Sequence, residues 1–95
     1  KQKKFLEPSV GTGNILLYVL KKKIDLGHDI IVALSNCYGI DIMKDNVYEC
    51  RKRMFVFCVE RGLKKKDWGE AIDIIKRNII VGNSIDLDID KIWND

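Results

Sequence analysis

The 95-residue sequence has little proline, few cysteines and no long apolar run. Pro8 is its single proline, and a chain with one proline and seven glycines is not a low-complexity linker. Cys37, Cys50 and Cys58 are odd in number and include no C-x-x-C pair, so we expect reduced, buried thiols in a cytoplasmic protein. One histidine and three scattered cysteines are too few for a zinc site. No stretch approaches the roughly 20 apolar residues of a membrane span, and no secretion signal is visible.

What is present is the composition of one small globular domain. Hydrophobic residues make up 46% of the chain, and the net charge of +3 permits contact with nucleic acid without demanding it. The chain begins on Lys1 without an initiator methionine, so we expect residues 1–95 to be a single partial domain of a longer protein.

Hydrophobic periodicity predicts alternating strands and helices. The predicted strands are 3–8, 38–42 and 78–82, and the predicted helices are 14–23, 29–36, a segment around 47–58 that ends at Gly62, and a segment that starts at Asp67. Asp29 and Asp67 are the expected helix caps. The tail after residue 84 reads either as an edge strand or as an acidic loop before a short helix. This order indicates an α/β fold, with parallel strands joined by right-handed crossovers.

Three helical stripes follow from the same spacing. They comprise Ile15, Leu16, Val19 and Leu20 in the first helix; Val47, Cys50, Met54, Phe57 and Cys58 in the third; and Trp68, Ala71, Ile72 and Ile75 in the fourth. The second helix is the short apolar run IIVALSN. We expect these residues to form the core.

The stretch "EPSVGTGNIL" joins the first strand to the first helix. Gly11 and Gly13 would let the backbone turn tightly and let a ligand approach. The dinucleotide pattern G-x-G-x-x-G is incomplete, because Leu16 occupies the third glycine position. Glu7 would also repel phosphates, which favours a ligand that carries a positive charge or amine donors. A sulfonium nucleoside with an amino-acid arm fits; a plain strand-to-helix turn is the alternative.

The other two strands end in polar residues at the same predicted edge of the sheet. Asp41 could accept hydrogen bonds from ribose hydroxyls, or could be a helix cap. Ile42 could cover an adenine face. Asn83 could meet the base edge, or could simply form a turn.

These three segments resemble the S-adenosylmethionine-dependent DNA methyltransferases of restriction–modification systems that methylate amino groups. "EPSVGTGNIL", "YGIDIMKDNVYECRKRM" and "NIIVGNS" are similar to their first three motifs, in order. The resemblance implies a partial Rossmann-like methyltransferase fold, with the first three parallel strands and their flanking helices. It also implies a cofactor site made by Glu7, Pro8, Ser9, Gly11, Gly13, Asn14, Asp41, Ile42, Asn83 and Ser84.

Within that resemblance, Glu7 and the glycine turn would hold the methionine part of the cofactor. Asp41 would bind the ribose and Ile42 would pack on the adenine. Asn83 departs from the family, which usually has Asp there, although an amide oxygen still accepts a hydrogen bond from an amine.

A larger departure concerns catalysis. The family holds its target amine with an Asn/Asp/Ser-Pro-Pro-aromatic motif, and this chain has no Pro-Pro pair. We therefore expect the cofactor-binding part of a DNA adenine-N6 methyltransferase, with no catalytic residue of its own and with DNA contacts made by other parts of the parent. In that family the first strand is central, and without the fourth strand it becomes an exposed apolar edge, so we also expect self-association or marginal stability. The alternatives are a methyltransferase for protein or RNA, a non-catalytic module of the same fold, and a nicotinamide-binding unit.

Overall fold

The computed structural model describes residues 3–86 of the chain. Its elements are β1 (Phe5–Glu7), α1 (Asn14–Asp25), α2 (Ile30–Ser35), β2 (Cys37–Asp41), α3 (Lys44–Glu60), the 3-10 turn η1 (Lys65–Asp67), α4 (Trp68–Asn78) and β3 (Ile79–Val81). The predicted order of strands and helices is confirmed. The predictions for the acidic tail beyond residue 86 lie outside the described residues.

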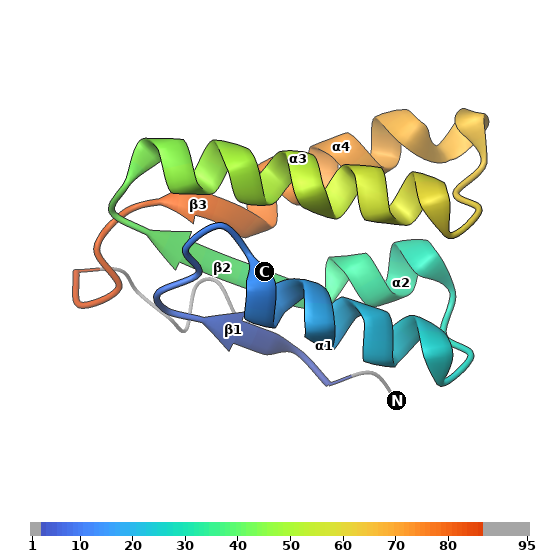
Figure 1. The fold of residues 1–95 in the computed structure, drawn as a ribbon, viewed down its shortest axis with the longest axis horizontal. Coiled ribbons are helices and arrows are strands. Elements are labelled where there is room, and N and C mark those ends of the chain that lie inside the picture. The colour runs from blue at the N-terminus through green and yellow to red at the C-terminus, as the bar shows by residue number, and fades with distance from the viewer. Residues whose placement is uncertain (1–2, 87–95) are drawn as a thin grey trace.

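The three described strands form one parallel sheet in the order β1-β2-β3. Glu7 pairs with Gly39, and Asp41 pairs with Val81. All three strands end at the same side of the molecule, and α1 and α3 run back from there towards the opposite end (Figure 1). The chain is therefore α/β with a parallel sheet, as the periodicity predicts.

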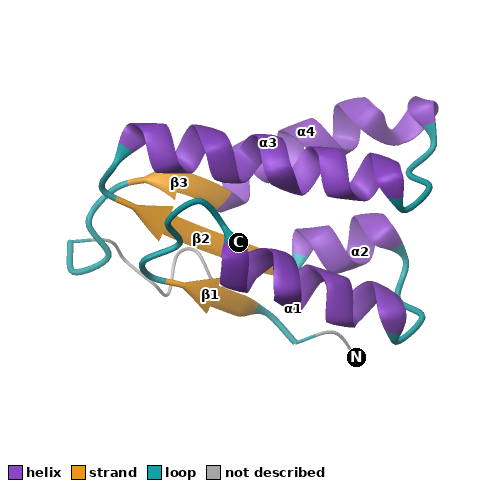
Figure 2. Ribbon diagram, in the orientation of Figure 1, coloured by secondary structure: helices purple, strands orange, loops and turns teal. Residues whose placement is uncertain are grey.

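The helices form a second layer in which α2 packs on α4 and α3 packs on both α4 and the sheet (Figure 2). Two right-handed crossovers that step across a sheet in one direction place their helices on the same face. Among residues 3–86, the buried side chains of the core are apolar apart from Asn78 and include Leu16, Leu20, Ala33, Leu34, Cys37, Val47, Cys50, Met54, Cys58, Ala71, Ile75 and Ile79. Asn78 is satisfied there, because its amide donates to the carbonyls of Ser35 and Cys37, both at 3.2 Å.

Two residues predicted for the core face outwards instead. Ile15 of α1 is 57% exposed, whereas its neighbour Leu16 is fully buried. In α4, Ile72 is 38% exposed, whereas Ile74, which lies outside the predicted stripe, is buried at 5%. Successive helical residues differ by about 100° around the axis, so Ile72 and Ile74 point in nearly opposite directions, and the rotation of the helix about its axis decides which face is buried.

The two predicted helix caps also differ in outcome. Asp29 caps α2, because its side chain accepts a hydrogen bond from the Val32 N–H at 3.2 Å. Asp67 precedes α4, but its side chain makes no capping hydrogen bond. The 3-10 turn η1 runs directly into α4, and the helical backbone of Asp67 does not suit a capping side chain.

Within residues 3–86, no helix has both the length and the apolar character that crossing a bilayer requires.

Gly39, in the middle of β2, sets how closely the β1–α1 connection approaches the sheet. A Cβ atom at this position would lie 2.6 Å from Val10 Cγ2, 2.9 Å from Val10 Cβ and 3.3 Å from Leu16 Cδ2. Val10 is buried, so it has no room to move away. Side chains from the connection and from α1 therefore occupy the space that a side chain at position 39 would need.

We expect Gly39→Ala to lower the free energy of unfolding by about 1–3 kcal/mol, because the added methyl group overpacks this contact. Gly69→Ala is the matched control, since a Cβ there meets nothing within 4 Å. Urea denaturation of both variants measures the difference. Equal stability of the two variants would contradict the packing role of Gly39.

Candidate functional site

The connection between β1 and α1 is a tight turn that continues the pairing with β2. The N–H of Val10 donates to the Ile40 carbonyl at 2.8 Å, and the N–H of Gly13 donates back to the Val10 carbonyl at 3.0 Å. Gly11 and Gly13 both have positive φ, of 57° and 99°. Side chains rarely tolerate this conformation, so the turn requires both glycines.

The two glycines differ in their surroundings. A Cβ at Gly13 would lie 2.8 Å from the Sγ of Cys50, so this glycine also permits close packing of α1 against α3. A Cβ at Gly11 would meet nothing within 4 Å. The space beside Gly11 is open, which is what the approach of a ligand to the backbone would require.

Asp41, the last residue of β2, connects this turn to the next one. Its Oδ2 accepts a hydrogen bond from the Gly11 N–H at 2.9 Å. Its Oδ1 accepts from the Met43 N–H at 2.8 Å and, more weakly, from the Asn46 amide at 3.4 Å. The hydrogen bond from Met43, followed by those from Gly11 and Asn46, lowers the pKa of the Asp41 carboxyl, against a smaller opposing effect of burial. Asp41 is thus a carboxylate that organises two loops.

Glu7 and its neighbours form the start of the turn. Glu7 is half-buried, and its Oε2 accepts a hydrogen bond from the Ser9 N–H at 3.1 Å. Pro8 and Ser9 are exposed, and β1 ends at Glu7, one residue before the end of the predicted strand 3–8. Asn14 begins α1, as the motif predicts. The negative charge of Glu7 therefore lies at the tip of β1, next to the turn.

The third strand tip contributes a second polar turn. Asn83 is exposed, and its Oδ1 accepts a hydrogen bond from the Ile85 N–H at 3.0 Å, with Ser84 half-buried in the same turn. This is the turn that the sequence left open as an alternative for Asn83. Ile42 lies just beyond β2 and is 69% exposed, although the predicted strand included it. Its side chain is an exposed apolar surface next to Asp41.

The topology brings these residues to one edge of the sheet. Gly11 and Asp41 are joined directly, and the Gly82 N–H donates to the Asp41 carbonyl at 2.9 Å, which continues the β2–β3 pairing to the tip. Glu7 pairs with Gly39, two residues short of Asp41, and the turn crosses the intervening distance. Open α/β sheets bind their ligands at the carboxyl ends of strands, where these residues lie.

Two residues that sequence reasoning did not assign to the site also support it. Asn46 lies in the first turn of α3 and donates to the Asp41 side chain. Its position five residues after Asp41, at the start of the following helix, is the sequence feature that could have indicated this contact. Arg53, two turns further along α3, donates to the Thr12 carbonyl at 2.8 Å and to the Asn14 side chain at 2.9 Å. No local pattern could have predicted the contact of Arg53.

The three cysteine side chains lie in the apolar core. Cys37, Cys50 and Cys58 are buried and free, and burial raises the pKa of the Cys50 thiol to about 11. They are therefore not reactive thiolates. Over residues 3–86, no three His, Cys, Asp or Glu side chains come together in a way that could hold a metal ion.

Comparison of the chain with protein-family models, curated proteins and solved structures finds no match. Its function is therefore inferred from the residues at the strand tips and their geometry.

We expect Asp41→Asn to lower the free energy of unfolding at pH 7 by about 1 kcal/mol, because the amide has one acceptor oxygen where the carboxylate has two. The effect stays this small because water can replace part of the lost hydrogen bonding at a site that solvent reaches. The lowered pKa means that the carboxylate stabilises the fold fully above the unfolded pKa of about 4. This contribution is lost as the pH falls through the folded pKa. The stability gap between wild type and variant should therefore shrink below about pH 4.

Urea denaturation from pH 7 to about pH 3 measures this gap. Asp73→Asn, which changes an exposed carboxylate on α4, is the control and should show no comparable gap. A gap for Asp41→Asn that stays constant over the whole range would contradict the role of the ionised carboxylate.

Proposed function

We propose that this chain binds S-adenosylmethionine as the cofactor-binding part of a DNA adenine-N6 methyltransferase. The observation that carries the proposal is the hydrogen bond between Asp41 and the Gly11 N–H, at the tips of two adjacent parallel strands. It places an ionised carboxylate beside a glycine turn with open space, with the acid Glu7 at the start of the same turn.

The charge at this edge supports a cationic ligand. Glu7 and Asp41 are both acidic and belong to neighbouring strand tips. A sulfonium nucleoside with an amino-acid arm brings a positive sulfur and an ammonium group, which two carboxylates stabilise. A nucleotide that brings only phosphates would meet repulsion at the same place.

Asp41 retains the capacity to bind a ribose. Within residues 3–86, its Oδ2 accepts one hydrogen bond, from Gly11, and a carboxylate oxygen has room for a second. A ribose hydroxyl would take that second position. Ile42, exposed next to Asp41, would then cover one face of the adenine. Asn83 would supply the polar contact at the base edge from the β3 tip.

A nicotinamide dinucleotide fits less well. The dinucleotide pattern uses its third glycine for close packing of helix on strand. Here the fully buried Leu16 occupies that position and lies over Gly39. In this chain the close contact between helix and strand therefore has its glycine on the strand rather than on the helix. The acid Glu7 also disfavours a pyrophosphate.

Methyl transfer itself needs a group that holds the target amine while its nitrogen attacks the methyl carbon of the sulfonium. The cofactor supplies that activated methyl group. The residues of this chain would bind and orient it, and the Pro-Pro-aromatic motif of the family would hold the flipped adenine. We assign the binding of S-adenosylmethionine to this chain. We assign the holding of the target amine and the contacts with DNA to the parts of a methyltransferase that carry the Pro-Pro-aromatic motif.

The alternatives share the same cofactor or the same fold. A methyltransferase for protein or RNA would bind S-adenosylmethionine in the same way and differ only in its target. A non-catalytic remnant or accessory binding module would keep this fold and carry out no chemistry. The proposal for DNA rests on the resemblance of the three motifs.

We expect titration calorimetry to show binding of S-adenosylmethionine and no binding of NAD. Ile42→Ala should weaken the affinity about tenfold, because the loss of apolar contact with the adenine costs about 1–2 kcal/mol. Because Ile42 is exposed, this variant should keep the wild-type stability.

Leu26→Ala is the matched control, since it removes a similarly exposed aliphatic side chain at the far end of α1. It should leave the affinity unchanged. Tighter binding of NAD than of S-adenosylmethionine, or equal affinities for wild type and Ile42→Ala, would contradict the proposal.

We also propose that the chain self-associates through β1, which is an edge strand of the described sheet. An edge strand presents unpaired N–H and C=O groups to which a second strand can pair. Sedimentation velocity should then show an average mass that rises with protein concentration. A single monomeric species over a hundredfold range of concentration would contradict this.

A further inference from the structure

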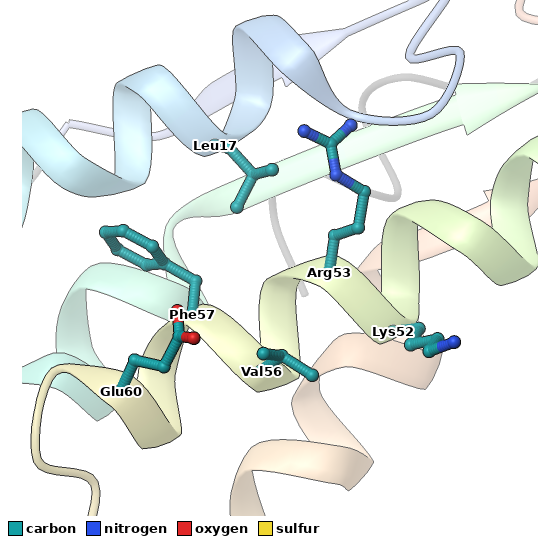
Figure 3. A pocket seen from close by; sticks show the side chains of 6 residues that line it. All are labelled: Leu17, Lys52, Arg53, Val56, Phe57 and Glu60. Atoms are coloured by element: carbon teal, nitrogen blue, oxygen red, sulfur yellow. The ribbon is translucent and has the colours of Figure 1, made fainter.

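Arg53 of α3 holds the glycine turn from a distant part of the sequence. Its Nη1 donates to the carbonyl of Thr12 at 2.8 Å, to the side-chain oxygen of Asn14 at 2.9 Å and to the hydroxyl of Thr12 at 3.3 Å. Figure 3 shows the side chain leaving α3 with its guanidinium group directed towards the β1–α1 connection. One cationic group thus binds the middle of the turn at three acceptors.

The turn needs an external restraint. Gly11 and Gly13 are the residues with the greatest backbone freedom, and fixing each one costs conformational entropy. Gly13 is also the N-cap residue of α1 and supplies no side-chain cap. Thr12 and Asn14 are exposed, so the core does not hold them in place.

Arg53 leaves α3 beside apolar side chains of both helices. It lines a groove of about 310 Å³ between α1 and α3, together with Leu17, Val56 and Phe57. Apolar neighbours of this kind pack against the methylene groups of an arginine and leave its charged end free to bind. The guanidinium group is therefore presented to the turn from α3 by a side chain that runs along the groove between the two helices.

We propose that Arg53 is a positioning residue for the cofactor. Asp41 fixes the turn at the Gly11 N–H, and Arg53 fixes it one residue later at the Thr12 carbonyl. Between them, these two contacts hold the Gly11–Gly13 backbone in the one shape that leaves the space beside Gly11 open. This inference rests on the proposed binding of S-adenosylmethionine, and it adds a residue that acts through the turn without touching the ligand.

Arg51 provides a matched control on the same helix. It also donates to main-chain carbonyls far away in the sequence, of Ile79 at 2.8 Å and of Lys76 at 3.2 Å. These hydrogen bonds lie at the junction of α4 and β3, its guanidinium group also lies 5.9 Å from the centre of the Tyr48 ring on α3, and none of these contacts is with the turn. Arg51→Gln therefore removes a comparable tether from the same helix and leaves the cofactor turn intact.

The first measurement is amide hydrogen exchange in the ligand-free protein. In Arg53→Gln, the amides of Gly11 and Gly13 should exchange about tenfold faster than in wild type, because the turn opens more often. In Arg51→Gln, these two amides should keep the wild-type rate. Arg53→Lys retains the charge and a donor, so its Gly11 and Gly13 amides should be partly protected, between wild type and Arg53→Gln. It also replaces Arg53→Gln as the test variant if Arg53→Gln does not fold.

The second measurement is calorimetry with S-adenosylmethionine. Arg53→Gln should weaken the affinity about tenfold and Arg51→Gln less than twofold, at similar losses of stability in urea. Arg53→Lys should lie between wild type and Arg53→Gln. A general loss of stability would affect both arginine variants alike, so this contrast isolates the positioning role.

Unchanged exchange at Gly11 and Gly13 in Arg53→Gln would overturn the inference. So would faster exchange combined with wild-type affinity, since the restraint would then not serve the ligand. A wild-type chain that binds no S-adenosylmethionine would instead refute the proposed function. The exchange arm, which uses no ligand, would still decide whether Arg53 holds the turn.

Discussion

The hydrogen bond from the Gly11 N–H to the Asp41 carboxylate is the interaction on which the site depends. It joins the first connection of the chain to the end of β2, thirty residues later. The same carboxylate accepts the Met43 N–H at the start of α3, so one side chain sets both loops at the strand tips. Three donors around a carboxylate favour its ionised form, which explains its lowered pKa. The position of the turn and the charge of the site thus have a common origin.

Close packing beneath the turn makes this contact possible. Gly39 has no side chain, and Val10 and Leu16 fill the space above it. Gly13 likewise has no side chain, and Cys50 of α3 packs directly against it. In each pair a glycine on one element receives a larger apolar side chain from another, which brings the turn down onto the sheet. The turn can then reach Asp41, which lies two residues beyond Gly39.

Opposite charges hold the turn on its two sides. The Asp41 carboxylate accepts a hydrogen bond from the Gly11 N–H of the turn, and Arg53 donates one to the Thr12 carbonyl of the turn. A cation at the N-terminus of α1 is disfavoured by the helix dipole, so Arg53 holds the turn through its hydrogen bonds rather than through its charge. The result is a turn whose donors and acceptors are restrained by side chains that come from β2 and α3.

Local patterns in the sequence determined the order of the elements, the parallel sheet and the placement of Gly11, Asp41 and Asn83 at the strand tips. Short apolar runs, glycines and capping residues act within a few positions, so they can be read without the fold. Tertiary structure decided the rest. It buried Ile74 rather than Ile72 and exposed Ile15, because periodicity leaves the rotation of a helix open. It also brought Arg53 to Thr12 across 41 residues. Such contacts depend on how α3 packs beside α1, which no short segment specifies.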